Sequence, residues 1–93
     1  MTGADILVQG LRAHGIEFLS IVCGNGLSPL LDACRRADFP VIDTRTEYGA
    51  AYLADAYARL TGKVAVVAVS SGIAHSNAFT GLMNAWFDGT PIL

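Results

Sequence analysis

Apolar positions along the chain follow two spacings. Some segments repeat an apolar residue every three or four positions, as one face of a helix does, and others are short apolar runs of strand length. Helical spacing covers 2–14, 28–36, 47–61 and 72–87, and strand-length runs cover 17–22, 39–43, 63–69 and 90–93. A helix follows each of the first three strands, which predicts an α/β fold: a doubly wound, mostly parallel sheet with helices on both faces.

Capping residues and turn formers mark the ends of these segments. Thr2 or Asp5 is placed to cap the first helix, and Gly15 is placed to end it. Ser28 and Pro29 have the order of a helix cap and a first helical residue. These short joints leave no room for a linker, so we expect one domain.

Two segments suggest a sheet larger than this chain provides. The run 63–69 (Lys-Val-Ala-Val-Val-Ala-Val) is almost continuously β-branched and apolar, which predicts a strand buried on both faces. A fourth strand begins at 90–93, where the sequence stops. An open apolar sheet edge favours aggregation, so we expect residues 1–93 to be part of a larger domain.

Composition and charge reduce the number of function classes that the sequence allows. Charged residues make up 15% of the chain and hydrophobic ones 53%, against about 25% charged in an ordinary domain, so we expect a partner to cover part of the surface. The net charge of −2, without a basic run, argues against nucleic-acid binding. No apolar stretch reaches membrane-spanning length, and no signal peptide begins the chain. Cys23 and Cys34 fit neither a zinc site nor a redox motif, so reduced thiols and a cytoplasmic location are expected.

Several known cofactor-binding and catalytic motifs are incomplete or absent in this sequence. Gly24-Asn25-Gly26 follows a strand, as in a dinucleotide-binding turn, but Pro29 stands where the third glycine belongs. No phosphate-binding loop and no nucleophile elbow is present, so Ser70 and Ser71 are expected to be helix caps. His14 is expected to cap a helix or lie on the surface. His75 is expected to be structural, with a position pointing into a site as the alternative. The aromatic residues Tyr48, Tyr52 and Phe79 are expected in a core or an interface.

Glu47 and the helix that it begins are more informative. Ligands of doubly wound folds bind beyond the carboxyl ends of the strands, where this carboxylate follows the second strand. The alternative is an acid that only complements the helix dipole. The helix itself is rich in alanine, with a smooth face centred on Ala51, Ala54 and Ala58. Such a face predicts close packing against another subunit or domain.

These residues resemble the N-terminal pyrimidine-binding domain of thiamine-diphosphate-dependent enzymes, in the acetolactate synthase and benzaldehyde lyase group of carboligases and 2-oxo acid decarboxylases. The resemblance runs from about Ala4 to Leu93. It is carried by 43–51 (Asp-Thr-Arg-Thr-Glu-Tyr-Gly-Ala-Ala), 54–59 (Ala-Asp-Ala-Tyr-Ala-Arg), 61–64 (Thr-Gly-Lys-Val), 70–77 (Ser-Ser-Gly-Ile-Ala-His-Ser-Asn) and 84–91 (Asn-Ala-Trp-Phe-Asp-Gly-Thr-Pro).

The resemblance implies a cofactor role for three parts of the chain. Glu47 would be catalytic, sharing a proton with the ring nitrogen of the cofactor's aminopyrimidine and so activating thiamine diphosphate. The turns at Gly24, Asn25 and Gly26 and at Ser71, Gly72 and Ile73 would line the same crevice. No metal ligand is assigned here, because Mg²⁺ and the diphosphate would be held by a region outside this chain.

The resemblance also implies what surrounds the domain. The substrate would be a small 2-oxo acid or aldehyde, and the site would form against a diphosphate-binding domain of the same or a partner chain, in a homodimer or homotetramer. The enzyme would be a lyase or transferase, and residues 1–93 alone would be inactive.

Three segments depart from the family pattern. Relatives usually carry histidine where Thr46 stands, a Gly-x-Pro-Gly-like turn at 22–24 and Gly-Pro-Gly at 72–74.

The rival hypothesis is a non-catalytic interaction module that is derived from a pyrimidine-binding domain and keeps the alanine-rich helix.

Overall fold

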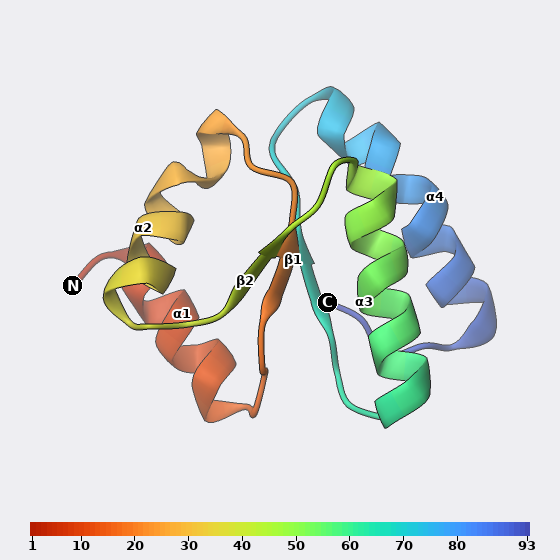
Figure 1. Cartoon of the computed structure of the whole chain (residues 1–93), viewed down its shortest axis with the longest axis horizontal. Helices are drawn as coiled ribbons and strands as arrows, with labels where there is room; N and C mark the ends of the chain where they lie inside the picture. The colour runs from red at the N-terminus through yellow and green to blue at the C-terminus, as the bar shows by residue number, and fades with distance from the viewer.

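A parallel sheet forms the middle of three layers in the computed structural model, which describes residues 1–93 (Figure 1). The helices are α1 (Gly3–Ala13), α2 (Ser28–Arg36), α3 (Glu47–Thr61) and α4 (Ile73–Asp88), with a short 3₁₀ helix η1 (Asn25–Leu27) before α2. The strands are β1 (Leu19–Ile21), β2 (Val41–Asp43) and β3 (Val66–Ala68). None of the helices has the length and apolar character that crossing a bilayer requires.

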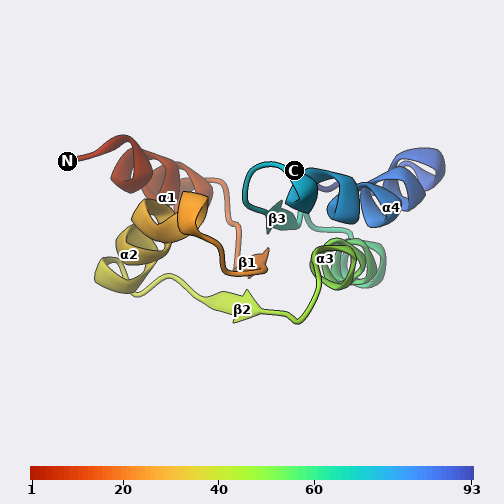
Figure 2. The same ribbon diagram turned by 90° about the horizontal axis from the view of Figure 1, so that it is seen from above.

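The sheet has the order β2-β1-β3, with Leu19 of β1 opposite Val41 on one side and Val66 on the other. Beyond β3, Ile92 pairs in parallel with Ala65, so the segment 90–93 does begin a fourth strand position. Figure 2 shows α1 and α2 on one face of the sheet and α3 and α4 on the other. The predicted doubly wound parallel α/β fold is therefore confirmed.

Burial along the strands differs from the prediction. Only the central strand β1 is fully enclosed, each of its residues being at most 1% exposed. In β3, Val67 and Ala68 are half-buried, and Val64 before it is 47% exposed. The prediction that 63–69 is buried on both faces was therefore wrong. An open apolar groove of about 760 Å³ lies between α1 and the 91–93 segment and leaves this side of the sheet uncovered.

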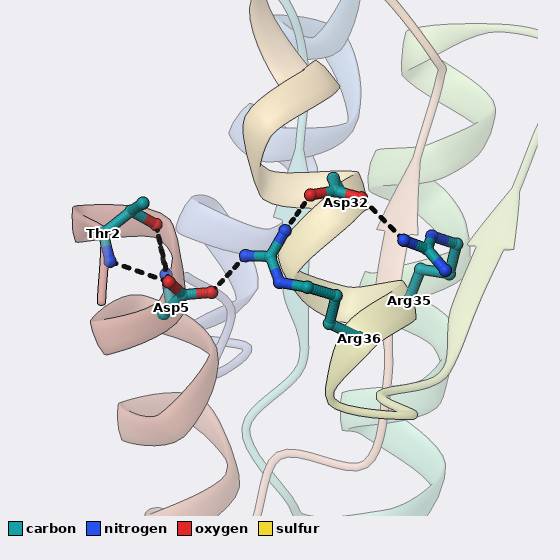
Figure 3. Close-up of polar contacts among 5 residues, drawn as sticks. All are labelled: Thr2, Asp5, Asp32, Arg35 and Arg36. Atoms are coloured by element: carbon teal, nitrogen blue, oxygen red, sulfur yellow. Dashed lines mark hydrogen bonds and ion pairs between the residues drawn. The ribbon is translucent and has the colours of Figure 1, made fainter.

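Helix α1 begins with a capping box. Thr2 Oγ1 accepts a hydrogen bond from the Asp5 backbone N–H (3.2 Å), and the Asp5 carboxylate accepts one from the Thr2 backbone N–H (2.7 Å). Arg36 of α2 lies between Asp5 and Asp32 and pairs with both, which ties the two helices together (Figure 3). The hydrogen bond from the Thr2 backbone and then that from Arg36 lower the pKa of Asp5 to about 2. In α2, by contrast, Leu27 is the N-cap and Ser28 makes no cap bond.

The alanine face of α3 is buried inside the chain. Ala50, Ala51, Ala54 and Ala58 are at most 1% exposed. Ala54 and Ala58 pack on Ala65, beside the sheet, while Ala51 meets Gly81 of α4. A Cβ on Gly81 would lie 2.5 Å from the Ala51 Cβ and 3.2 Å from its carbonyl carbon. The smooth face thus serves helix–sheet and helix–helix packing within this domain. The expected contact with another subunit or domain is not needed to explain it.

Polar groups hold α3 in place at two further points. Ser20, fully buried on β1, donates from Oγ to the Ala50 carbonyl at 2.7 Å. Asp55, 3% exposed, accepts hydrogen bonds from Arg59 Nε (3.0 Å to both oxygens) and from Asn84 Nδ2 of α4 (2.9 Å). Arg59 also reaches Asp88 at 2.6 Å.

The aromatic residues Tyr48, Tyr52 and Phe79, expected in a core or interface, are each more than 40% exposed.

Replacing Gly81 tests the helix contact. We expect Gly81→Ala to lower the free energy of unfolding by about 1–3 kcal/mol, the usual cost of overpacking, because the new methyl meets backbone atoms that cannot rotate away. Gly10→Ala on α1 is the matched control, since a Cβ there meets nothing within 4 Å, and it should add about 0.5–1 kcal/mol. Urea unfolding of both variants gives the comparison, and an unchanged midpoint for Gly81→Ala would contradict the close approach.

Removing Arg59 tests the buried carboxylate. Arg59→Leu leaves Asp55 buried with one partner fewer, and the loss should lie at the low end of the about 3–5 kcal/mol typical of a broken buried pair, because Arg59 is 38% exposed. Arg35→Leu, whose pair with Asp32 is exposed on both sides, should cost at most about 1 kcal/mol. Equal losses in chemical denaturation would refute the special role of Asp55.

The same pair gives a pH dependence. Burial acts to raise the pKa of Asp55, but hydrogen bonds led by that from Arg59 outweigh it and lower the pKa below its usual value. A depressed pKa in the folded state stabilises the protein above the unfolded value of about 3.9, and this stabilisation disappears as the pH falls through the folded value. The difference in stability between wild type and Arg59→Leu should therefore shrink in acid.

Candidate functional site

The carboxyl ends of the three parallel strands meet at one edge of the sheet, at the top of Figure 1, where α2, α3 and α4 all begin. Three turns converge here: 22–24 leading into η1, 44–46 and 69–72. Every residue that the sequence analysis assigned to the site lies on or directly after one of these turns. This is the edge at which doubly wound folds bind their ligands.

The turn before α3 is fixed by hydrogen bonds to its neighbours. The Thr44 backbone N–H and Oγ1 both donate to the Ile21 carbonyl of β1, at 2.8 and 2.9 Å. Thr46 is the N-cap of α3, and its Oγ1 accepts from the Gly49 N–H at 3.1 Å. A Cβ on Gly49 would lie 2.8 Å from that oxygen. The Thr46 hydroxyl is therefore engaged in starting the helix.

Glu47 is the first residue of α3 and is half-buried. Its Oε2 accepts a hydrogen bond of 3.1 Å from the side-chain amide of Asn77 on α4. Its other oxygen, Oε1, has no partner within the chain and can accept a proton or a hydrogen bond from a ligand. The sequence analysis gave Asn77 no role. The only available signal was its place one turn into a helix that begins at the same sheet edge.

The glycine turn lies against the start of the α4 segment. A Cβ on Gly24 would lie 2.7 Å from the Ser70 Cβ, and one on Gly26 would lie 3.1 Å from the Ser70 Oγ. Asn25, between them, is exposed and begins η1. Asp43, the last residue of β2, accepts a hydrogen bond from the Cys23 N–H at 3.1 Å. These contacts join the first and third turns of the site.

The third turn differs from the prediction at the serines. Gly72 is the N-cap of α4 and no side chain caps the helix, so neither Ser70 nor Ser71 is a cap. The Ser70 side chain lies against Gly24 instead, which explains the difference. Gly72 has φ 72° and ψ −128°, a conformation that glycine alone adopts readily. Ser71 is exposed and Ile73 is 77% exposed, so both face outward from this edge.

The structure brings together two pairs of the predicted elements. It places the glycine turn against Ser70-Ser71, and it places Glu47 against α4 through Asn77. His75 is exposed at this edge, while His14 is the exposed C-cap of α1. No cluster of three or more His, Cys, Asp or Glu side chains could hold a metal ion. The two grooves of the chain are lined by other residues, so this edge by itself encloses no ligand.

A double substitution tests the contact between the turns. Gly24→Ala should separate them and lower the melting temperature, because the new methyl would collide with Ser70, the only residue within 4 Å. Ser70→Gly removes both colliding atoms, so Gly24→Ala should cost much less in that background, with a coupling of about 0.5–3 kcal/mol. Additive losses in the thermal unfolding of the four proteins would show that the turns do not touch.

The chain is similar over nearly its whole length to known proteins. The model of the family "Thiamine pyrophosphate enzyme, N-terminal TPP binding domain" matches residues 1–93. The chain is 43% identical over 91 residues to 2-hydroxyacyl-CoA lyase 2 of Bos taurus, covering 98% of this chain and 14% of that protein. It is 39% identical over 97 residues to acetolactate synthase of Arthrospira platensis, covering all of this chain and 17% of that protein.

A third relative is the acetolactate synthase large subunit of Haemophilus influenzae, which is 37% identical over 94 residues, with all of this chain and 16% of that protein covered. The chain thus spans about a sixth or less of these relatives' length. The family match over the whole chain confirms the resemblance found in the sequence. The chain belongs to the family of N-terminal, thiamine-pyrophosphate-binding domains of thiamine pyrophosphate enzymes.

Proposed function

We propose that this domain supplies the pyrimidine-binding side of a thiamine-diphosphate site, in an enzyme that makes or breaks carbon–carbon bonds next to a carbonyl group. The observation that carries the proposal is the position of Glu47: a half-buried carboxylate at the carboxyl edge of the sheet, with Oε2 held and Oε1 free. Membership of the thiamine pyrophosphate enzyme family supports the choice of cofactor.

The residues at this edge fit such a cofactor. An aminopyrimidine ring nitrogen needs an acceptor with which it can share a proton, and Glu47 Oε1 is such an acceptor. The glycines of the 24–26 turn and Gly72 add no side chain that would fill the edge around it. Bound thiamine diphosphate supplies a carbon nucleophile that adds to a carbonyl and accepts the electron pair released by decarboxylation or cleavage.

The chain's own residues have three tasks in this proposal. Glu47 holds and shares the proton at the pyrimidine nitrogen, acting in general acid–base catalysis. Thr46 fixes the first turn of α3, on which Glu47 stands, through its cap to Gly49. The turns at Gly24, Asn25 and Gly26 and at Ser71, Gly72 and Ile73 line the crevice in which the ring would lie.

The rest of the site would come from elsewhere. Because this edge encloses no ligand and the chain has no metal-binding cluster, we propose that a diphosphate-binding domain, of the same or a partner chain in a homodimer or homotetramer, closes the site and holds Mg²⁺. Residues 1–93 alone would then be inactive. The free thiols Cys23 and Cys34 suit the reducing cytoplasm, which we propose as the location.

Two substrate classes follow from the relatives' names. The similarity to acetolactate synthases favours a 2-oxo acid as the first candidate substrate. The reaction would then be decarboxylation and carboligation. The 43% identity to a 2-hydroxyacyl-CoA lyase favours cleavage of a 2-hydroxyacyl thioester as the second. The rival hypothesis, a non-catalytic interaction module, loses its main support because the alanine face is occupied within the chain.

The test is Glu47→Gln in the assembled enzyme. Glutamine keeps the shape and a hydrogen bond but cannot share the proton, so hydrogen–deuterium exchange at the reactive thiazolium carbon of bound cofactor should slow by about 10²–10⁴. Cofactor affinity should change much less. Asp38→Asn, at an exposed acid that precedes β2 and so lies at the end of the strand opposite Glu47, is the control and should exchange at the wild-type rate. Wild-type exchange in Glu47→Gln would leave Glu47 as a residue that only complements its helix dipole.

A further inference from the structure

We propose that Asn77 is a positioning residue for Glu47: its side-chain amide holds Oε2 so that Oε1 is presented to the pyrimidine. The proposal rests on the catalytic role proposed for Glu47. The observation behind it is the 3.1 Å hydrogen bond from Asn77 Nδ2 to Glu47 Oε2, which joins the first residue of α3 to the second turn of α4.

The hydrogen bond between Glu47 and Asn77 lies next to a close packing contact between α3 and α4. Figure 1 shows α3 and α4 running side by side in the same direction. Residues four positions apart lie above one another on the same face of a helix. Ala51 lies four positions after Glu47 and Gly81 lies four positions after Asn77, and a Cβ on Gly81 would lie 2.5 Å from the Ala51 Cβ. The Glu47–Asn77 hydrogen bond therefore lies one helical turn from the close contact between Ala51 and Gly81.

The chemistry of an amide suits this task. A glutamate side chain has three rotatable bonds, and leaving it free would lose catalytic geometry that an enzyme must otherwise restore on each turnover. An amide N–H donor fixes one oxygen but, unlike a lysine or histidine, adds no charge and does not titrate. The titratable residues carried by the turns and helix starts at this edge are Cys23, Asp43, Arg45, Tyr48 and His75. None of them forms a hydrogen bond to Glu47.

A pair of alanine substitutions provides the first test. Asn77→Ala removes the donor, and Ser76→Ala removes a polar group from the neighbouring exposed position, which makes no side-chain bond in the structure. Alanine favours helix formation, so both variants should fold. In the chain without cofactor, NMR three-bond couplings should show one dominant Glu47 side-chain rotamer in wild type and Ser76→Ala. They should show rotamer averaging in Asn77→Ala.

The assembled enzyme provides the second test. Hydrogen bonds to charged groups are worth roughly a 10- to 100-fold effect, so cofactor proton exchange should slow by about that factor in Asn77→Ala and stay unchanged in Ser76→Ala. Asn77→Asp keeps the shape but places a second carboxylate against Glu47, so exchange should slow further. Cofactor affinity should change less than exchange in both Asn77 variants.

The outcomes separate this proposal from the one on which it rests. If Glu47→Gln slows exchange but Asn77→Ala and Asn77→Asp both exchange at the wild-type rate with an unchanged Glu47 rotamer, the positioning role is refuted and the catalytic role stands. If Glu47→Gln itself has no effect, the catalytic role fails. The rotamer measurement still reports whether Asn77 holds the carboxylate.

Discussion

The contact between α3 and α4 at Ala51 and Gly81 is the constraint on which the rest of this domain depends. A Cβ on Gly81 would lie 2.5 Å from the Ala51 Cβ and 3.1 Å from the Tyr52 backbone nitrogen, so the close approach of the two helices depends on glycine at this position. Polar links lie on both sides of this point, Glu47 to Asn77 on one and Asp55 to Asn84 on the other. The Arg59–Asp88 pair ends the series. The contact at Ala51 and Gly81 sets the distance between the helices, and the polar pairs join it in fixing their register.

This constraint explains why the segment that begins at Glu47 has the residues it has. Gly49 leaves room for the Thr46 cap, Ala50 presents its carbonyl to Ser20 of the central strand, and Ala51 meets Gly81. Each is small because a different neighbour approaches at that position. Together these contacts fix the first turn of α3 relative to β1 and α4, and Glu47 is fixed with it. The small residues of this segment thus meet a packing requirement, and that packing fixes the position of the Glu47 carboxylate.

The sequence predicted the order of elements, the parallel sheet and a cap at Thr2 or Asp5, of which Thr2 is the N-cap, because these depend on periodicity and on neighbours close along the chain. It also placed Glu47 at the correct sheet edge, since strand direction follows from topology. It wrongly predicted that Ser70 and Ser71 cap a helix, and it gave Asn77 no role. Their partners, Gly24 and Glu47, are 46 and 30 positions away, and no local pattern reports such contacts. Exposure of β3 was also missed, because it depends on what covers the sheet edge.

Stability and the proposed chemistry share one interface in this domain. A shift of one residue along α4 would turn its side chains by about 100° around the helix axis, which would move Asn77 away from Glu47 and replace Gly81 by a residue with a Cβ. The second change would press a Cβ against the backbone of α3, at the cost of about 1–3 kcal/mol expected for Gly81→Ala, and it therefore opposes the first. Packing thereby adds to the hydrogen bond, worth roughly 1.5–3 kcal/mol, in keeping Asn77 beside Glu47. The small residues beside Glu47 therefore help to fix the position of its carboxylate.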